Sequence, residues 1–519
     1  MKKIKKQVCC PTVLIILDGF AIPKNKKISA INPETAPNIY NYLKKYPNSR
    51  LKTYGEFVGL FPDQQGNSEA GHLNIGAGRI IKQDLSIISE AIENGTFFKN
   101  TAFKEALFHA KKYKKAVHVM GLLTNGNSAH SYPDHLYALL EYFRQEGQKE
   151  VYLHLFTDGR DSSPQGAVDF LQELRKYMNN GEKIATIMGR FYAMDRNKLW
   201  NRTKQAYEAM VLGKGCTANS AEEALIQSYN RGETDEYICP TVILEKGKPV
   251  ATIKDNDVIY FFNARSDRAR QITKVFVQPD FEKINPGAFV RKKLPQNIRF
   301  VAMSDFGPDL PGILTAFPSY VITNTLPMVL KNKKQVYIAE SEKYAHVTYF
   351  INGGYADPVN GEIRIKIDSP LVKTYDEKPE MSAYLVTEEI LNCLKENKLD
   401  FYCVNFANTD MVGHTGNLEA AKKAVYAVDE CVKKIVDEVL ARDGQVIITA
   451  DHGNADIMIN EKTGEVMTEH TLNLVPFILI SKKLKNIKLK NGILADVTPT
   501  LLKMLNIEKP TEMTGRALY

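Results

Sequence analysis

Three apolar runs in this chain are followed by aspartate or histidine, residue types that often bind metal ions, and this pattern constrains the fold more than any other feature. The runs cover residues 12–17, 401–406 and 445–450. They lead into Asp18, into Asp410 with His414, and into Asp451 with His452. Continuous apolar runs of this length are typical of buried strands in a parallel sheet, and ligands of such sheets bind at the carboxyl ends of the strands. The sequence therefore predicts an α/β fold that brings these side chains together.

The middle of the chain has its own alternation of strands and helices. Residues 116–123, 151–156, 184–188 and 258–262 read as strands, and residues 133–145 and 199–212 as helices. In the outer part we expect helices over residues 381–396, 418–440 and 497–505. A chain of 519 residues also exceeds the usual size of one hydrophobic core. We therefore expect residues 1–81 and 317–519 to form one discontinuous domain, and residues 82–316 to form an inserted α/β domain.

A glycine-rich segment from Gln65 to Arg79 is centred on Ser68. Glycines let a backbone turn sharply and approach a ligand closely, which suits a loop that presents a hydroxyl to a phosphoryl group. By itself such a segment is more often an ordinary turn. A serine hydroxyl is also a weak nucleophile that needs a neighbouring base or a metal ion. The functional interpretation of Ser68 therefore depends on the ligands at the strand ends.

The candidate metal ligands come from separate segments of the chain. They are Asp18, Ser68, Asp410, His414, Asp451, His452 and His470. Any one of them could be an ordinary capping or surface residue, but the whole set follows strands or lies in glycine-bearing loops. Three carboxylates, three imidazoles and a hydroxyl suit two divalent ions. Mixed oxygen and nitrogen ligands favour Mn²⁺ or Zn²⁺ over Mg²⁺, and we expect Mn²⁺.

Arginines gather after the predicted strands of the middle block. They are Arg160 beside Asp161, Arg190, Arg196, Arg265 and Arg268. A single arginine is usually a solvated residue or part of a salt bridge. Several at the strand ends of one domain predict a site for an anion, because guanidinium groups bind carboxylate and phosphate with two parallel hydrogen bonds.

Composition excludes several other classes of function. No apolar run reaches the roughly 18 residues of a membrane helix, and Asp18 interrupts the basic, apolar start that imitates a signal peptide. The seven cysteines lack a C-x-x-C spacing, which favours reduced thiols in a cytosol. The net charge of +8 is spread over the whole chain. We expect no nucleic-acid partner and no membrane partner.

An ordered set of motifs resembles the cofactor-independent phosphoglycerate mutase family, within the alkaline phosphatase superfamily. The motifs are Ile16-Leu17-Asp18-Gly19, Gly66-Asn67-Ser68-Glu69, Asp158-Gly159-Arg160-Asp161, Arg265 with Arg268, Asp410 with His414, and Thr449-Ala450-Asp451-His452-Gly453-Asn454. The resemblance covers nearly the whole chain. It implies an alkaline-phosphatase-like core domain that binds metal, with an inserted phosphotransferase domain that binds substrate.

The resemblance also implies roles for individual residues. One metal ion would be held by Asp410, His414 and His470, and the other by Ser68, Asp18, Asp451 and His452. The residues around the phosphoglycerate would be His130, Arg160, Asp161, Arg190, Arg196, Arg265, Arg268 and Lys343. Such a substrate carries about three negative charges near neutral pH, which agrees with the gathered arginines.

The function implied is the interconversion of 3-phosphoglycerate and 2-phosphoglycerate through a phosphoserine at Ser68, without 2,3-bisphosphoglycerate. We expect a cytoplasmic monomer of glycolysis and gluconeogenesis. One alternative is another metal-dependent phosphomutase or a phosphomonoesterase of the same superfamily, which would share the metal ligands but need not share the arginines. Another is a basic binding protein on a former enzyme scaffold, which would be expected to have lost several ligands.

Overall fold

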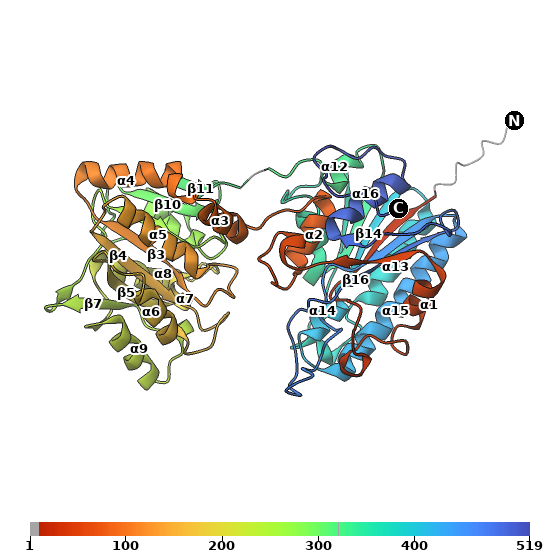
Figure 1. The fold of residues 1–519 in the computed structure, drawn as a ribbon, viewed down its shortest axis with the longest axis horizontal. Helices are drawn as coiled ribbons and strands as arrows, with labels where there is room; N and C mark the ends of the chain where they lie inside the picture. The colour runs from red at the N-terminus through yellow and green to blue at the C-terminus, as the bar shows by residue number, and fades with distance from the viewer. Residues whose placement is uncertain (1–9, 320) are drawn as a thin grey trace. The chain divides into compact units, whose positions relative to one another are not determined.

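The structure, a computed structural model, describes residues 10–319 and 321–519. These residues divide into two compact units, with breaks after Gln83 and before Val321 (Figure 1). Unit 1 contains the segments outside these breaks, and unit 2 contains the segment between them. The second break lies a few residues beyond the boundary expected from the sequence. The reason is that β11 (Ile313–Phe317) pairs with β10 (Arg299–Ser304), which keeps its residues in the sheet of unit 2.

Unit 1 is built on a mixed sheet with the strand order β13-β12-β14-β1-β15-β16-β2-β17 within the described residues. In chain order these strands are β1 (Thr12–Leu17), β2 (Asn48–Lys52), β12 (Gln335–Glu340), β13 (Ile363–Ile367), β14 (Phe401–Phe406), β15 (Gln445–Thr449), β16 (Val475–Ser481) and β17 (Gly492–Ile493). Strand β1 lies between β14 and β15 and is parallel to both. The three apolar runs predicted as buried parallel strands are therefore confirmed as neighbours.

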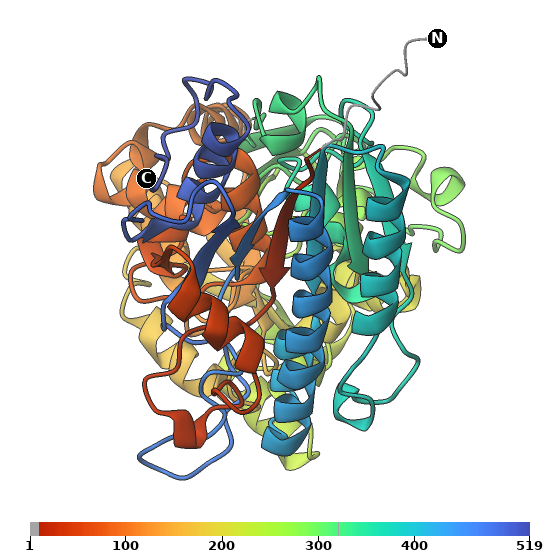
Figure 2. The ribbon, with the colours of Figure 1, turned by 90° about the vertical axis from the view of Figure 1, so that its right-hand side faces the viewer.

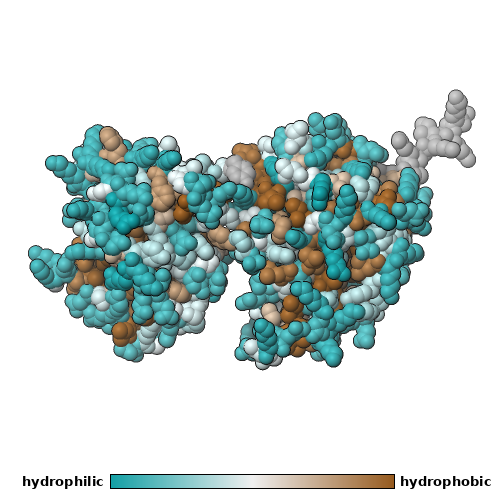
Figure 3. Space-filling view, viewed as in Figure 1, coloured by the Kyte–Doolittle hydropathy of each residue, from teal (hydrophilic) through white to brown (hydrophobic). Residues whose placement is uncertain are grey.

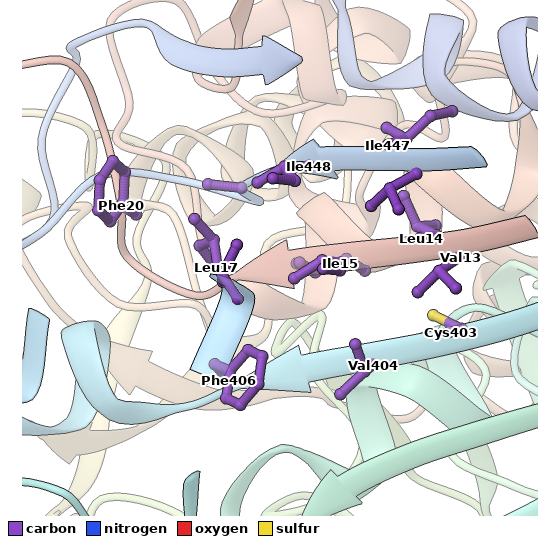
Figure 4. Close-up of a cluster of buried hydrophobic side chains, with 14 of the residues drawn as sticks. Val13, Leu14, Ile15, Leu17, Phe20, Cys403, Val404, Phe406, Ile447 and Ile448 are labelled. Atoms are coloured by element: carbon purple, nitrogen blue, oxygen red, sulfur yellow. The ribbon is translucent and has the colours of Figure 1, made fainter. Parts of the chain in front are cut away.

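The core of unit 1 surrounds β1, whose residues are all buried. Figure 4 shows apolar side chains of β1, such as Leu14, beside those of Val404 in β14 and Ile447 in β15. Burial of side chains of this size contributes roughly 1.5–3 kcal/mol each to stability. Strand β1 is thus apolar on both faces, as expected of a central strand that is covered on both sides of the sheet.

Helices of unit 1 cover this sheet. They are α1 (Pro37–Lys45), α2 (Ser68–Ala77), α12 (Leu326–Val329), α13 (Ala383–Glu396), α14 (Asn408–Gly413), α15 (Leu418–Ala441) and α16 (Val497–Met504). Helix α15 packs on β1 and β15 and contacts both α13 and α1 (Figure 2). Helix α2 packs against α16. The predicted helices over residues 381–396, 418–440 and 497–505 are confirmed as α13, α15 and α16, with small shifts at their ends.

Unit 2 has a second sheet, in the order β11-β10-β9-β3-β4-β5-β7-β6, with β8 paired to β7. Its remaining strands are β3 (Val117–Leu123), β4 (Val151–Thr157), β5 (Lys183–Gly189), β6 (Cys216–Ala218), β7 (Thr241–Glu245), β8 (Lys248–Pro249) and β9 (Val258–Phe261). Strands β9, β3, β4 and β5 are consecutive and parallel. Their carboxyl ends therefore lie along one edge of the sheet.

The helices of unit 2 complete the inserted α/β unit. They are α3 (Asp84–Glu93), α4 (Thr101–Tyr113), α5 (Pro133–Gln145), α6 (Ala167–Arg175), α7 (Arg190–Ala193), α8 (Trp200–Leu212), α9 (Ala221–Asn230), α10 (Arg270–Val277) and α11 (Phe281–Ile284). Helix α5 begins with Pro133, whose fixed φ and missing N–H suit the first helical position. The α/β class with a second α/β unit, expected from the sequence, is confirmed.

Hydrophobic residues lie in small groups among hydrophilic ones on the face shown in Figure 3. Within residues 10–319 and 321–519, no helix combines the length and the apolar character needed to cross a bilayer.

Candidate functional site

Predicted site residues of unit 1 gather at the carboxyl ends of four adjacent parallel strands. Asp18 follows β1, Lys343 follows β12, Asp410 lies in α14 just after β14, and Asp451 follows β15. Gly19 makes this close packing possible, because it has φ +71° and a Cβ there would lie 2.8 Å from Cα of Asp410. The chain can turn beside Asp410 only with a glycine at this position.

Ser68 is the first residue of α2, and its hydroxyl lies inside this cluster. Its Oγ is 3.1 Å from Oδ1 of Asp18 and 3.0 Å from Nε2 of His452. Lys343 donates from Nζ to the same Oγ over 2.7 Å. The preceding Asn67 caps the helix by accepting from the Ala70 amide, which fixes the start of α2 and with it the position of Ser68. The structure thus brings a buried hydroxyl into contact with a carboxylate, an imidazole and an ammonium group.

Three histidines, His414, His452 and His470, face the cluster with Nε2 and contact backbone carbonyls with Nδ1. Nδ1 of His414 contacts the Thr468 carbonyl, Nδ1 of His470 contacts the Gly66 carbonyl, and Nδ1 of His452 contacts the Gly453 carbonyl. A carbonyl oxygen only accepts, so each Nδ1 carries a hydrogen. In the neutral rings the lone pair is then on Nε2, and these nitrogens face the carboxylates, 3.2 Å from Oδ1 of Asp410 for both His414 and His470. Ligating histidines in metal sites are oriented in this way.

The pKa values of Asp18 and Asp410 in the cluster are shifted strongly from their usual range. Burial, and then the nearby Asp451, raises the pKa of Asp18 to about 6. Burial alone would also raise the pKa of Asp410, but Lys343 and the neighbouring histidines hold it well below its usual value. Lys343 contacts Asp18 at 2.7 Å and Asp410 at 2.6 Å, and these carboxylates outweigh burial and raise its pKa. The cluster therefore carries more negative than positive charge and favours cations.

The donor atoms of this cluster fit divalent metal ions. Two overlapping groups have ligand atoms within 4.8 Å of one another, namely Asp410 with His452 and His470, and Asp18 with Asp451 and His452. Oδ2 of Asp451 is buried, lies 3.4 Å from a ring nitrogen of His72 and of His452, and makes no hydrogen bond among the described residues, which fits an atom that could bind a metal ion. His414 is more exposed, but its Nε2 lies 3.0 Å from Nε2 of His470. All seven predicted ligands are thus together.

The predicted residues of unit 2 form a second cluster at the ends of β3, β4, β5 and β9. Nη1 of Arg190 donates to Asp158 over 2.5 Å and to Oδ2 of Asp161 over 2.8 Å. Ser128 donates to the same Oδ2 over 2.7 Å, so Oδ1 of Asp161 remains available to a further donor. Arg190 is almost fully buried, and its Nε has no hydrogen-bond partner among the described residues.

A second group of charges surrounds Asp267. Arg196 donates to Oδ2 of Asp267 over 2.6 Å, and Arg265 and His130 lie 3.3 and 3.8 Å from its Oδ1. Burial lowers the pKa of His130 to about 4, so this imidazole is neutral near pH 7.

Cations of unit 2 also lie close to one another. Burial, and then the neighbouring Arg196, Arg190 and Arg160, lowers the pKa of Arg268. Arg160 itself is half exposed and lies 3.7 Å from Glu236. Mutual repulsion among guanidinium groups is relieved when an anion binds between them. The structure therefore brings the predicted arginines together in an arrangement suited to an anion.

Three supporting residues were not predicted from the sequence. Asn405 in β14 donates to Oδ2 of Asp18 over 2.8 Å, and Asn454 donates to Oδ1 of Asp410 over 3.3 Å. His72 lies 3.4 Å from Oδ2 of Asp451 and contacts the Ser68 carbonyl at 2.8 Å. His72 could have been found from its spacing, because it lies one helical turn after Ser68 on α2. Asn405 was a weaker signal, because it is a polar residue within the otherwise apolar run of β14. The structure shows that its side chain is fully buried.

Comparison with known proteins gives consistent matches. The family model described as the BPG-independent PGAM N-terminus matches residues 88–308, and that of type I phosphodiesterase / nucleotide pyrophosphatase matches residues 313–494. The 2,3-bisphosphoglycerate-independent phosphoglycerate mutase of Clostridium acetobutylicum is 50% identical over 98% of this chain and 99% of its own. That of Clostridium perfringens strain 13 is 49% identical over the same shares. A Leishmania mexicana phosphoglycerate mutase, solved at low cobalt concentration, matches 99% of this chain and 98% of its own with a TM-score of 0.75 at 29% identity.

Proposed function

The chain belongs to the family of 2,3-bisphosphoglycerate-independent phosphoglycerate mutases, and from this we propose that it interconverts 3-phosphoglycerate and 2-phosphoglycerate. The reaction belongs to glycolysis and gluconeogenesis and needs no 2,3-bisphosphoglycerate. Ser68 carries the phosphoryl group between the two positions of the glycerate. The observation that supports this role best is the position of its Oγ, in contact with Asp18, His452 and Lys343.

Two divalent metal ions, most favourably Mn²⁺, are part of the proposal. Asp410, His414 and His470 would hold one ion, and Asp18, Ser68, Asp451 and His452 the other. When bound, such ions lower the pKa of a hydroxyl and neutralise charge on phosphoryl oxygens. The mixture of carboxylate and imidazole donors, with each Nε2 turned inward, supports this assignment.

Ser68 acts as the nucleophile. Its hydroxyl donates to Oδ1 of Asp18, and a metal ion held beside it would lower the pKa of this hydroxyl, so that its proton can be lost as Oγ attacks and be given to the leaving oxygen. As Oγ bonds to phosphorus, the bond from phosphorus to the 3-oxygen of the substrate breaks and glycerate is released with that oxygen protonated. The 2-hydroxyl of the reoriented glycerate then loses a proton and takes the phosphoryl group from Ser68. Lys343, already on Oγ, offers its positive charge to the phosphoryl oxygens.

Unit 2 binds the glycerate part of the substrate in this proposal, and unit 1 is the metal-binding phosphatase-like domain. The substrate-binding residues are His130, Arg160, Asp161, Arg190, Arg196, Arg265 and Arg268, with Lys343 from unit 1. Guanidinium groups match the carboxylate of glycerate, and the available Oδ1 of Asp161 suits a glycerate hydroxyl. Retention of glycerate on unit 2 is what makes the enzyme a mutase, because escape would leave only hydrolysis of phosphoserine.

The decisive experiment is conversion of 3-phosphoglycerate to 2-phosphoglycerate with Mn²⁺ and no added 2,3-bisphosphoglycerate. We expect turnover in this mixture. Absence of turnover with Mn²⁺, Co²⁺, Zn²⁺ and Mg²⁺ would refute the proposal, and release of inorganic phosphate alone would favour a phosphomonoesterase. We further propose a cytoplasmic monomer, to be tested by cell fractionation and by light scattering.

A further inference from the structure

Two cysteines of unit 2 have their sulfur atoms in direct contact. Sγ of Cys216 lies 2.7 Å from Sγ of Cys239, and both side chains are partly exposed. Cys216 begins β6, and its amide donates to the Pro240 carbonyl over 3.0 Å, next to Cys239. The two cysteines are thus held side by side by backbone pairing. Among the six cysteines that the structure describes, this is the one pair with touching sulfurs.

Residues 235–238, which directly precede Cys239, pack against two loops that carry arginines of the proposed anion site. These arginines are Arg160 and Arg190. The amide of Gly189, next to Arg190, donates to the Ile238 carbonyl over 2.8 Å. A Cβ at Gly189 would lie 2.2 Å from the Glu236 carbonyl oxygen, and one at Gly159, next to Arg160, would lie 2.6 Å from the Glu236 amide. Residues 235–238 therefore pack directly beneath the backbone that carries these arginines.

We propose that Cys216 and Cys239 are a redox-active pair, and that their oxidation to a disulfide weakens substrate binding by unit 2. A disulfide requires an S–S distance of about 2.05 Å, so the sulfurs must approach by roughly 0.7 Å. Cys239 follows Ile238, whose carbonyl accepts from the Gly189 amide next to Arg190, so we expect backbone movement at Cys239 to reach Arg190. Displacements of this order at positioning groups are sufficient to change catalysis. The effect on binding rests on the function proposed above, whereas formation of the disulfide does not.

The oxidant is a small-molecule disulfide such as oxidised glutathione. Burial raises the pKa of Cys239 to about 12 and keeps this thiol protonated, so the Cys216 thiolate attacks a sulfur of the oxidant and expels one glutathione thiolate, which leaves a mixed disulfide on the protein. Cys239 then loses its proton, attacks the Cys216 sulfur of that mixed disulfide and expels the other glutathione. The Cys216–Cys239 bond is formed, its two electrons reduce the oxidant, and the two thiol protons are taken up by the two glutathione thiolates. Excess reduced glutathione reverses both steps.

The test uses the full-length protein loaded with Mn²⁺. The protein is incubated with reduced or with oxidised glutathione, remaining thiols are alkylated, and peptides are mapped by mass spectrometry. We expect a peptide cross-linked through Cys216 and Cys239 after oxidation, and its loss after reduction. Cys216→Ser and Cys239→Ser should each abolish this cross-link, and Cys393→Ser should leave it unchanged. Failure to form the cross-link in the wild type would overturn the proposal.

Kinetics of the same samples test the consequence for binding. We expect KM for 3-phosphoglycerate to rise by roughly threefold to tenfold on oxidation of the wild type and to be unchanged in Cys216→Ser. A disulfide that forms without a change in KM would overturn the link to the anion site. If the reduced enzyme has no mutase activity at all, the proposed function fails, and the cross-link result still decides whether the pair is redox-active.

Discussion

The two units use the same architecture for opposite charges. In both, candidate site residues follow adjacent parallel strands and meet at the carboxyl edge of a sheet. In unit 1 three aspartates outnumber a single lysine, and in unit 2 arginines outnumber the acidic groups that pair with them. The charge at the first edge favours cations, and the charge at the second favours an anion. The difference teaches that the sheet determines where the site residues lie. The charge of the residue after each strand determines which kind of ligand the edge can bind.

The largest expected effect comes from unit 1. Asp451→Asn removes one charge from the most buried part of the cluster, so we expect metal binding to weaken and both mutase and phosphatase activity to fall by about 10³-fold or more. Ser68→Ala should reduce both activities to background, because a methyl group cannot accept a phosphoryl group. The measurements are release of 2-phosphoglycerate and of inorganic phosphate from 3-phosphoglycerate.

Asp443→Asn is a matched control, because Asp443 is an exposed residue of the same unit that pairs with Lys482. It should retain the activity of the wild type. Appreciable mutase or phosphatase activity of Ser68→Ala would show that another nucleophile operates. The chemical step could then not be assigned to unit 1.

A change in unit 2 should instead alter the products. Asp161→Asn weakens the site proposed for a glycerate hydroxyl and leaves the metal cluster intact. We expect glycerate to escape before it is rephosphorylated, so that the ratio of inorganic phosphate to 2-phosphoglycerate rises by roughly tenfold or more. Asp169→Asn, in α6 of the same unit, is the control. An unchanged ratio with measurable turnover would contradict the division of roles between the units.

The two units should also respond differently to pH. Burial alone would lower the pKa of His470, but its hydrogen bond to Asp410 raises it above the usual value. Protons therefore compete with metal increasingly as the pH falls from 8 to 6, and the apparent affinity for Mn²⁺ should fall by about tenfold or more. Burial lowers the pKa of His130 to about 4, and arginines stay charged, so binding of glycerate should change little over this range. Titrations of Mn²⁺ and of glycerate at pH 8 and pH 6 measure the contrast, and equal Mn²⁺ affinities at the two pH values would exclude His470 as a ligand.

The smallest expected effect concerns stability at the carboxyl end of β12 in unit 1. Burial raises the pKa of Glu340, at the end of β12, from 4.5 to about 7. A carboxyl with a raised folded-state pKa contributes stability below its unfolded pKa, and this contribution is lost as the pH rises toward 7. Glu340→Gln should therefore be more stable than the wild type by about 1 kcal/mol or more at pH 8, with a smaller difference at pH 5. Urea unfolding at both values tests this, and a difference that is larger at pH 5 would show that Glu340 is ionised in the fold.

Much of this arrangement could be predicted because it depends on local pattern. The run of β1 is apolar throughout and ends at Asp18, so its burial and the position of the carboxylate follow from the sequence. Helix α5 has a proline at its start and clear periodicity, and its predicted bounds agree with the structure. By contrast, β16 is an equally apolar run that pairs antiparallel to β15 and was not singled out, since no ligand-type residue directly follows it.

Side-chain pairing could not be predicted in the same way. The bonds from Arg190 to Asp158 and Asp161 join the ends of different strands and depend on rotamers that no sequence spacing fixes. The role of Asn405 depends on which neighbour β14 takes in the sheet, and that neighbour is β1, from the far end of the chain. Long-range strand pairing thus limits how far the supporting residues of a site can be found from sequence alone.

That pairing also has a consequence for how the protein is made. Thr12 of β1 lies beside Phe401 and Gln445, so the central strand of unit 1 has no partner until the last part of the chain leaves the ribosome. The segment from Asp84 to β11 can complete its own sheet well before then. Domains that emerge first generally fold first during synthesis. The nascent chain would therefore acquire the unit proposed to bind the anion early, whereas the proposed nucleophile and the proposed metal ligands would come together only at the end of translation.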